Sequence, residues 1–337
     1  MAEHTYDQII NDLQKKIYHP IYLLSGDESF FIDSIVNYME ENILDAMEKE
    51  FNQTIMYGLD TNVGTLISYA KSYPMSANYQ VLIVKEAQNM KEISLLESYV
   101  ENPLKSTILV LAYKHKKIDK RLKFYKLVKK LGVVFESKKL WDNKIPEWIQ
   151  GYIKKQSFRI QARESELLSE YLGNDLSKIA NELKKLTITL KKGDMISPDI
   201  IEQNIGISKE YNIFALTDAL AAKDIYQSNK IIQYFIGDEK NHSIHGIIPM
   251  LYSFFHKSLV YLQIKNKSDK YGVASALGVA PSMVSRYAQG SRNYPPMKLA
   301  AIIGYLKEAD LKAKGVNATG FVKNTEILKE LIFKILH

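Results

Sequence analysis

The chain has 337 residues, 46% of them hydrophobic and 25% charged, which is typical of a soluble globular protein large enough for two or three domains. It contains no cysteine, so disulfide bonds and thiolate catalysis are excluded and a reducing compartment is favoured. The net charge of +7 suits an anionic partner, but a lysine-rich surface is its commoner cause. Because the N-terminus lacks an export signal and no apolar run could span a bilayer, we expect a cytoplasmic protein without membrane contact.

The first part of the chain alternates between amphipathic helices and short apolar strands. The spacing of apolar residues predicts helices at 5–17, 32–43 and 66–73, and strands at 21–24, 51–60, 81–84, 107–113 and 133–136. Such alternation is typical of a parallel sheet covered by helices on both faces. We therefore predict an α/β domain with a five-stranded parallel sheet over residues 1–140.

No further strands are expected after Trp141. Helical patterns at 148–153, 167–172, 175–190 and 198–205 predict a small all-helical unit over residues 141–208. A larger all-helical unit is predicted over 209–337, with helices at 213–222, 225–236, 244–264, 271–277, 281–288, 296–314 and 321–336.

The stretch IYLLSGDESFFIDSI, residues 21–35, has the layout of a phosphate-binding loop between a strand and a helix. A working loop needs G-x-x-x-x-G-K-[ST], in which backbone N–H groups, the lysine and the hydroxyl hold phosphates and magnesium. Here the turn is Gly26, Asp27, Glu28 and Ser29, with one glycine, no lysine and two carboxylates that would repel phosphate. The turn also has a structural use, because Asp27 or Ser29 can cap the helix that follows.

A second strand end lacks the chemistry that holds a metal ion. ATPases of this layout end a later strand in Asp-Glu, where the aspartate holds magnesium and the glutamate orients water. The matching strand here is VLIVKEAQNM, which has Lys85 in place of the aspartate and then Glu86. A cation at that position repels magnesium, so we predict a degenerate nucleotide site and no ATP hydrolysis.

Five stretches, in order along nearly the whole chain, resemble the delta subunit family of bacterial DNA polymerase III. They are YLLSGDESFFID, SYPMSANYQVLIVKEAQ, YLGNDLSKIANELKKL, ALGVAPSMVSRYAQGSR and LKEADLKAKG. The resemblance implies an AAA+-like α/β domain without a functional nucleotide site (1–140), a small helical lid (141–208) and a helical collar that packs into a five-subunit ring (209–337).

The resemblance also implies a function in DNA replication. Members of the family bind and open the beta sliding clamp so that the clamp loader can place it on primed DNA, and they do not hydrolyse ATP themselves. The implied partners are the clamp, the delta-prime and gamma/tau subunits and, indirectly, DNA. The chain would be a non-catalytic subunit of a DNA-directed DNA polymerase holoenzyme, with no catalytic residue, cofactor or metal of its own.

The family's clamp contact is a proline-led apolar tip before the third strand, which corresponds here to Tyr73, Pro74, Met75 and Ser76. An aromatic ring and a flexible thioether at a loop tip suit an apolar pocket on a partner. Ser76 departs from the family pattern, which usually has a second large apolar residue there. The alternative is that Tyr73 and Met75 merely cover the underlying core.

Residues 101–140 contain 12 lysines and arginines against 3 acidic residues. This segment is either a solvated helix face or a surface that contacts the DNA phosphate backbone. The candidate phosphate contacts are Lys114, Lys116, Lys117, Lys120 and Arg121.

Two rival functions remain open from the sequence. Residues 273–292 have a helix-turn-helix pattern with Ser282, Ser285 and Arg286 expected to point outward, which would suit a DNA-binding regulator. An active AAA+ ATPase is the second rival. His242 and His245 could share a helix face, but no third zinc ligand is evident nearby.

Overall fold

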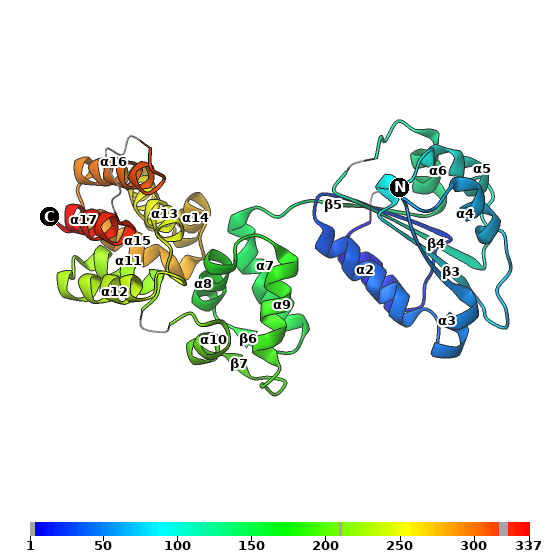
Figure 1. Cartoon of the computed structure of the whole chain (residues 1–337), viewed down its shortest axis with the longest axis horizontal. Coiled ribbons are helices and arrows are strands. Elements are labelled where there is room, and N and C mark those ends of the chain that lie inside the picture. The colour runs from blue at the N-terminus through cyan, green and yellow to red at the C-terminus, as the bar shows by residue number, and fades with distance from the viewer. Residues whose placement is uncertain (1–3, 117, 209–210, 317–322) are drawn as a thin grey trace. The chain divides into compact units, whose positions relative to one another are not determined.

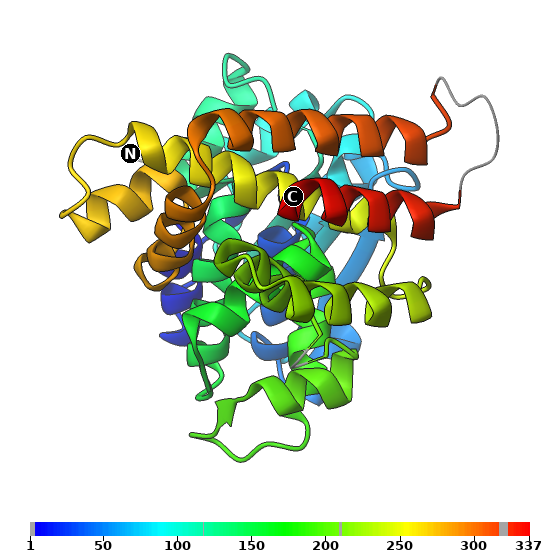
Figure 2. The same cartoon turned by 90° about the vertical axis from the view of Figure 1, so that its left-hand side faces the viewer.

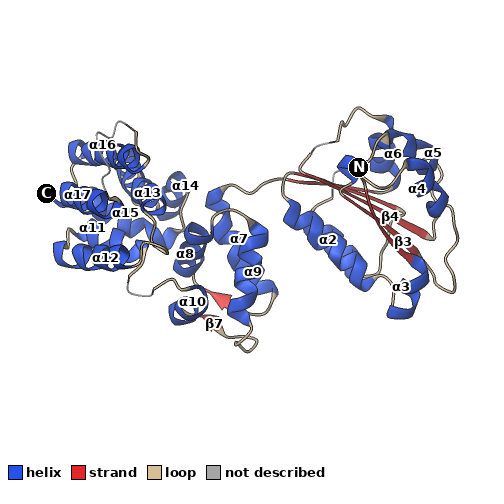
Figure 3. Cartoon of the chain, in the orientation of Figure 1, coloured by secondary structure: helices blue, strands red, loops and turns tan. Residues whose placement is uncertain are grey.

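The computed structural model describes residues 4–116, 118–208, 211–316 and 323–337. It separates the chain into two compact units, Met1–Leu140 and Trp141–His337 (Figure 1). Strands are concentrated in the first unit, and the second is almost entirely helical (Figure 3). The finer division of the second unit into a lid and a collar stays a prediction, because the expected boundary adjoins residues outside the described part.

A five-stranded parallel sheet forms the centre of the first unit, which confirms the predicted fold class. Its strands, in the order β2-β3-β4-β1-β5, are β1 (Ile21–Gly26), β2 (Gln53–Tyr57), β3 (Gln80–Lys85), β4 (Thr107–Lys114) and β5 (Val133–Ser137). β1 lies between β4 and β5, and it is buried along its whole length. The carboxyl end of β1 is therefore enclosed by the ends of two neighbouring strands.

Helices cover both faces of this sheet because successive strand side chains point to opposite faces. Ile21 and Leu23 pack on the face covered by α4, α5 and α6, whereas Tyr22 and Leu24 pack under α1 and α2. The helices of this unit are α1 (Tyr6–Gln14), α2 (Ser29–Asn42), α3 (Ala46–Asn52), α4 (Val63–Ala70), α5 (Glu97–Val100) and α6 (Lys123–Leu131), with short 3₁₀ helices η1 (Ala87–Asn89) and η2 (Ile93–Leu96).

The second unit is a set of packed helices. They are α7 (Ile145–Lys155), α8 (Ala162–Leu172), α9 (Leu176–Thr187), α10 (Pro198–Ile205), α11 (Ile213–Ala222), α12 (Ile225–Gly237), α13 (Ile244–Gln263), α14 (Lys270–Leu277), α15 (Val284–Asn293), α16 (Pro296–Ala313) and α17 (Asn324–Leu336), with 3₁₀ helices η3 (Asp142–Lys144) and η4 (Pro281–Met283). Figure 2 shows α16 and α17 side by side, and α16 also packs on α13.

The expectation that no strand follows Trp141 is wrong. Arg159–Ile160 (β6) pairs in parallel with Met195–Ile196 (β7) and joins the two ends of the segment that contains α8 and α9. A strand of two residues is too short to show an alternating pattern, so the sequence carried no signal for it. In the described part of the chain, no helix is both long and apolar enough to cross a membrane.

Candidate functional site

The turn of residues 26–29, here called the corner turn, is held by Ser137 at the end of β5. Asp27 N–H donates to the Ser137 carbonyl oxygen at 3.0 Å, and Glu28 N–H donates to Ser137 Oγ at 3.1 Å. The Ser137 hydroxyl in turn donates to the Glu28 carbonyl oxygen. The sequence reasoning missed Ser137, because its contact with the turn spans more than a hundred residues of chain.

Gly26 is required at this corner for two physical reasons. Its φ of +131° lies in a region that residues with a side chain rarely adopt. A Cβ atom at Gly26 would also lie only 2.0 Å from the carbonyl oxygen of Ser137. The single glycine that remains from the phosphate-loop pattern thus allows two backbones to approach closely.

The residue that caps α2 is Glu28, so the predicted caps Asp27 and Ser29 are wrong. α2 begins at Ser29, which makes the residue before it the N-cap, and a Glu28 carboxylate oxygen accepts from Phe30 N–H at 3.2 Å. Glu28 is buried, and its carboxylate lies at the first-turn N–H groups that would bind phosphate in a working loop. A carboxyl group of the chain therefore lies at the N-terminus of α2, the end of a helix that favours anions.

Two lysines at strand ends are paired with carboxylates of α2. Lys85 Nζ at the end of β3 lies 2.9 Å from a Glu40 carboxylate oxygen, and Lys114 Nζ at the end of β4 lies 2.8 Å from Asp33 Oδ1. Glu86, which follows Lys85, has left-handed backbone geometry and accepts a hydrogen bond from the Asn89 side chain. The described residues include no group of three side chains that could hold a metal ion.

The loop of residues 73–76, here called the tip loop, lies between α4 and β3 and presents the side chains of Tyr73 and Met75 to solvent. Tyr73 is 77% exposed and Met75 is 65% exposed, so neither covers the core. Ser76 has a φ of +52°, where a bulky β-branched residue would be strained. The small side chain of serine avoids the crowding that such a residue would meet in this conformation.

Three of the five candidate phosphate contacts already have carboxylate partners. Lys114 pairs with Asp33, as described above. Lys120 lies 2.5 Å from a Glu136 carboxylate oxygen, and Arg121 lies 2.8 Å from an Asp119 carboxylate oxygen. Hydrogen bonds from Arg121 lower the pKa of Asp119 to about 2. Lys116 is exposed, and Lys117 lies outside the described residues. DNA contact by this set stays a prediction.

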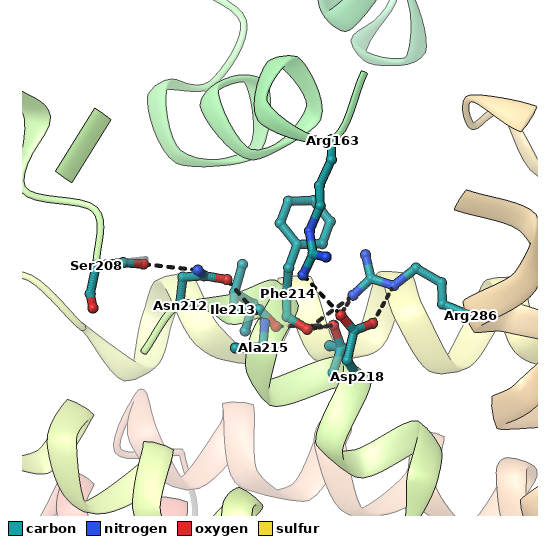
Figure 4. A network of polar contacts seen from close by, with 9 residues as sticks. Arg163, Ser208, Asn212, Ile213, Phe214, Ala215, Asp218 and Arg286 are labelled. Carbon is teal, nitrogen blue, oxygen red and sulfur yellow. Dashed lines mark hydrogen bonds and ion pairs between the residues drawn. The ribbon is translucent and has the colours of Figure 1, made fainter. Parts of the chain in front are cut away.

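The segment with the helix-turn-helix pattern folds as α14, η4 and α15, but the expectation that Arg286 points outward is wrong. Arg286 is only 8% exposed, and its guanidinium lies 4.4 Å from the centre of the Phe214 ring. The Arg286 Nη2 atom donates to the Phe214 carbonyl oxygen at 3.3 Å (Figure 4). The same atom also donates to Thr217 Oγ1. This arginine is part of the core between α15 and α11.

Asp218 extends this network to a second arginine. Its carboxylate lies 3.2 Å from Arg286 Nε and 3.1 Å from Arg163 Nη2, so one side chain of α11 joins α15 to α8 (Figure 4). Glu166, also on α8, accepts from Ala280 N–H at 3.0 Å, and its burial raises its pKa. The segment 273–292 is thereby fixed within the second unit, which disfavours its use as a DNA-reading element.

His242 is engaged in aromatic packing. Its ring stacks on Phe235 with a centroid distance of 4.3 Å, and burial lowers its pKa. Stacking of this kind provides a structural use for the histidine that needs no metal.

The parallel sheet and the strand-turn-helix corner define an α/β domain of phosphate-loop layout that is followed by a helical unit. Two sequence models of one family match this chain: the DNA polymerase III delta subunit over residues 22–138, and the C-terminal domain of that subunit over residues 210–334. Together they cover well over half of the sequence, in the expected order. The chain belongs to the DNA polymerase III delta subunit family.

Individual relatives agree with this assignment. The DNA polymerase III subunit delta of Bacillus subtilis is 26% identical over 95% of this chain and 93% of its own length. A solved structure of the Bacillus subtilis DNA clamp loader delta protein (YqeN) has a TM-score of 0.54 at 23% identity, covering 98% and 99% of the two chains, which supports the fold. The Thermotoga maritima RuvB branch migration motor reaches a TM-score of only 0.35 and adds no argument.

Replacing Gly26 with alanine tests the close approach of β1 and β5. The new methyl group would overlap the Ser137 backbone, so we expect Gly26→Ala to lower the free energy of unfolding by at least about 2 kcal/mol in urea denaturation. The control is Gly151→Ala in α7, where no atom crowds the new Cβ. Alanine there should be neutral or stabilise by up to about 1 kcal/mol. Equal midpoints for the two variants would contradict this account of the corner.

Replacing Arg286 with alanine tests its place in the core. The change removes charged hydrogen bonds to Thr217 and Phe214, so the free energy of unfolding should fall by roughly 1.5–3 kcal/mol. Arg292→Ala, at an exposed position near the end of the same helix, is the matched control and should change stability by less than about 0.5 kcal/mol. If Arg286→Ala were as stable as the control, the buried network would not contribute to folding.

Proposed function

We propose that this chain binds the beta sliding clamp through its tip loop and opens the clamp ring without hydrolysing ATP itself. The supporting observation is an exposed apolar tip on the compact α/β unit of a member of the delta subunit family. An exposed aromatic ring and thioether at a loop tip are the residue types that fill apolar pockets on partners.

The corner turn supports the second half of the proposal. The buried Glu28 carboxylate lies where phosphate would bind, and the strand-end cation Lys85 is already paired with Glu40. Binding a nucleotide would bring its phosphates next to a buried carboxylate, and magnesium next to an ammonium group, both of which are repulsive. The energy for opening would then come from ATP bound by sister subunits.

The rest of the chain is assigned by the same proposal. The B. subtilis relative is named as a DNA clamp loader protein, and we extend this assembly to the present chain, with delta-prime and gamma/tau subunits as neighbours. Residues 141–208 would form the lid and residues 209–337 the collar of the ring. Lys116 and the basic residues around it would lie near DNA held by the assembly, where phosphate contacts are electrostatic and sensitive to salt.

Met75→Asp tests the clamp contact directly. A carboxylate in an apolar pocket loses its hydration without compensation, so we expect the affinity for the organism's sliding clamp to fall by roughly 30-fold or more. Met297→Asp, at an exposed methionine of the second unit, is the control and should bind like the parent. Surface plasmon resonance with immobilised clamp measures both variants. Unchanged binding of Met75→Asp would place the contact elsewhere.

Isothermal titration with ATP and magnesium tests the corner turn. We expect no binding to the purified chain at micromolar concentrations, because Glu28 already occupies the first turn of α2. The organism's ATP-binding loader subunit, titrated in the same buffer, serves as the positive control. Micromolar binding to this chain, or release of phosphate by it, would overturn the assignment of a degenerate site and favour an active ATPase.

A further inference from the structure

We propose that Asn52 is the positioning residue of the tip loop: it fixes the backbone of Met75 so that the apolar tip is already formed before the clamp arrives. This inference rests on the proposed function and adds to it a residue outside the tip loop. Asn52 is the last residue of α3, a helix that the sequence did not predict, and it lies 23 positions before Met75.

The Asn52 side chain makes paired contacts with Met75. Its Oδ1 atom accepts from Met75 N–H at 2.6 Å, and its Nδ2 atom donates to the Met75 carbonyl oxygen at 3.0 Å. A carboxamide can satisfy the N–H and the C=O of one residue together, as a neighbouring strand would. Asn52 thereby substitutes for a strand at a point of the loop where the sheet provides none.

The geometry of Asn52 is itself fixed. Its Nδ2 atom also donates to the carbonyl oxygen of Glu48, one turn earlier in α3, at 3.0 Å. The residue is 2% exposed, so water competes little for these hydrogen bonds. Both amide hydrogens and the amide oxygen are thus engaged, and a buried amide with all its partners in place holds one rotamer.

The stem of the loop is anchored separately. Thr107 Oγ1 donates to the carbonyl oxygen of Ala70. The side-chain NH₂ group of Gln80, in the amide orientation that places it against acceptors, donates to the carbonyl oxygens of Ser72 and Tyr69. These contacts fix the end of α4 and stop short of the tip itself. The hydrogen bonds to Asn52 act beyond them, at Met75, so the stem can stay in place when Asn52 is removed.

Preformation of the tip matters because a loop with several conformations binds with an affinity reduced by the fraction in the competent form. The side chains of Tyr73 and Met75 are 77% and 65% exposed, so packing within the chain does little to order them. The backbone contact with Asn52 therefore supplies order where side-chain packing does not. It leaves the apolar side chains free for a partner.

The test combines amide hydrogen exchange with clamp binding on the full chain. In Asn52→Ala we expect the Met75 amide to exchange at least about 10-fold faster while amides of β1 and β4 keep their protection, and the Kd for the organism's sliding clamp to rise by about 10-fold. Asn52→Asp keeps the side-chain volume and one acceptor, but it places a carboxylate oxygen against the Met75 carbonyl oxygen. Because these two acceptors repel each other, this variant should bind the clamp more weakly still.

The matched control is Asn42→Ala at the end of α2. It removes the same kind of hydrogen bond, from a side-chain amide to a carbonyl oxygen one turn earlier. It should leave both the Met75 exchange rate and the clamp Kd within about twofold of the parent. If Asn52→Ala keeps slow Met75 exchange or parental clamp affinity while Met75→Asp loses the clamp, the positioning role is wrong and the clamp contact stands. If Met75→Asp binds normally, the proposed function itself fails.

Discussion

The arrangement of the first unit depends on the contact between β1 and β5 at Gly26 and Ser137. Because Gly26 lacks a Cβ atom, the carbonyl group of Ser137 can lie against the end of β1 and bind the corner turn. This contact sets where α2 starts. The start of α2 in turn brings Glu28 to the helix N-terminus and carries Asp33 and Glu40 to the lysines at the ends of β4 and β3.

This dependence explains why the strand-turn-helix corner is present although the phosphate-loop motif is incomplete. α2 buries Ile32, Ile35 and Met39 against the sheet, and it can do so only if the turn delivers the helix at the right angle. The backbone of the turn is therefore needed for folding. The side chains around the turn carry no such constraint, and the strand-end lysines Lys85 and Lys114 form ion pairs with carboxylates of α2.

Local patterns in the sequence were sufficient for the sheet and insufficient for the contacts that fix its ends. The strands β1, β3, β4 and β5 were predicted because buried parallel strands are continuous apolar runs. The partly exposed edge strand β2 was predicted as part of a longer strand over 51–60 that runs into α3. α3 was missed because its outward side chains Met47 and Phe51 are apolar and blur the helical pattern. Ser137, Asn52 and Asp218 were missed for another reason, since each acts on a partner far away in the sequence.

Arg286 was assigned the wrong exposure because its partners, too, lie far away in the sequence. In the sequence it lies on the polar side of a helix-turn-helix pattern, and polarity alone predicts exposure. The fold buries it because α11 supplies an aromatic face from Phe214, a hydroxyl from Thr217 and a carboxylate from Asp218. A charged side chain can be buried where partners of all three kinds converge. Asn212 caps α11 by accepting from Ala215 N–H, and it donates to the Ser208 carbonyl oxygen (Figure 4). These hydrogen bonds fix the start of the helix that carries the partners of Arg286.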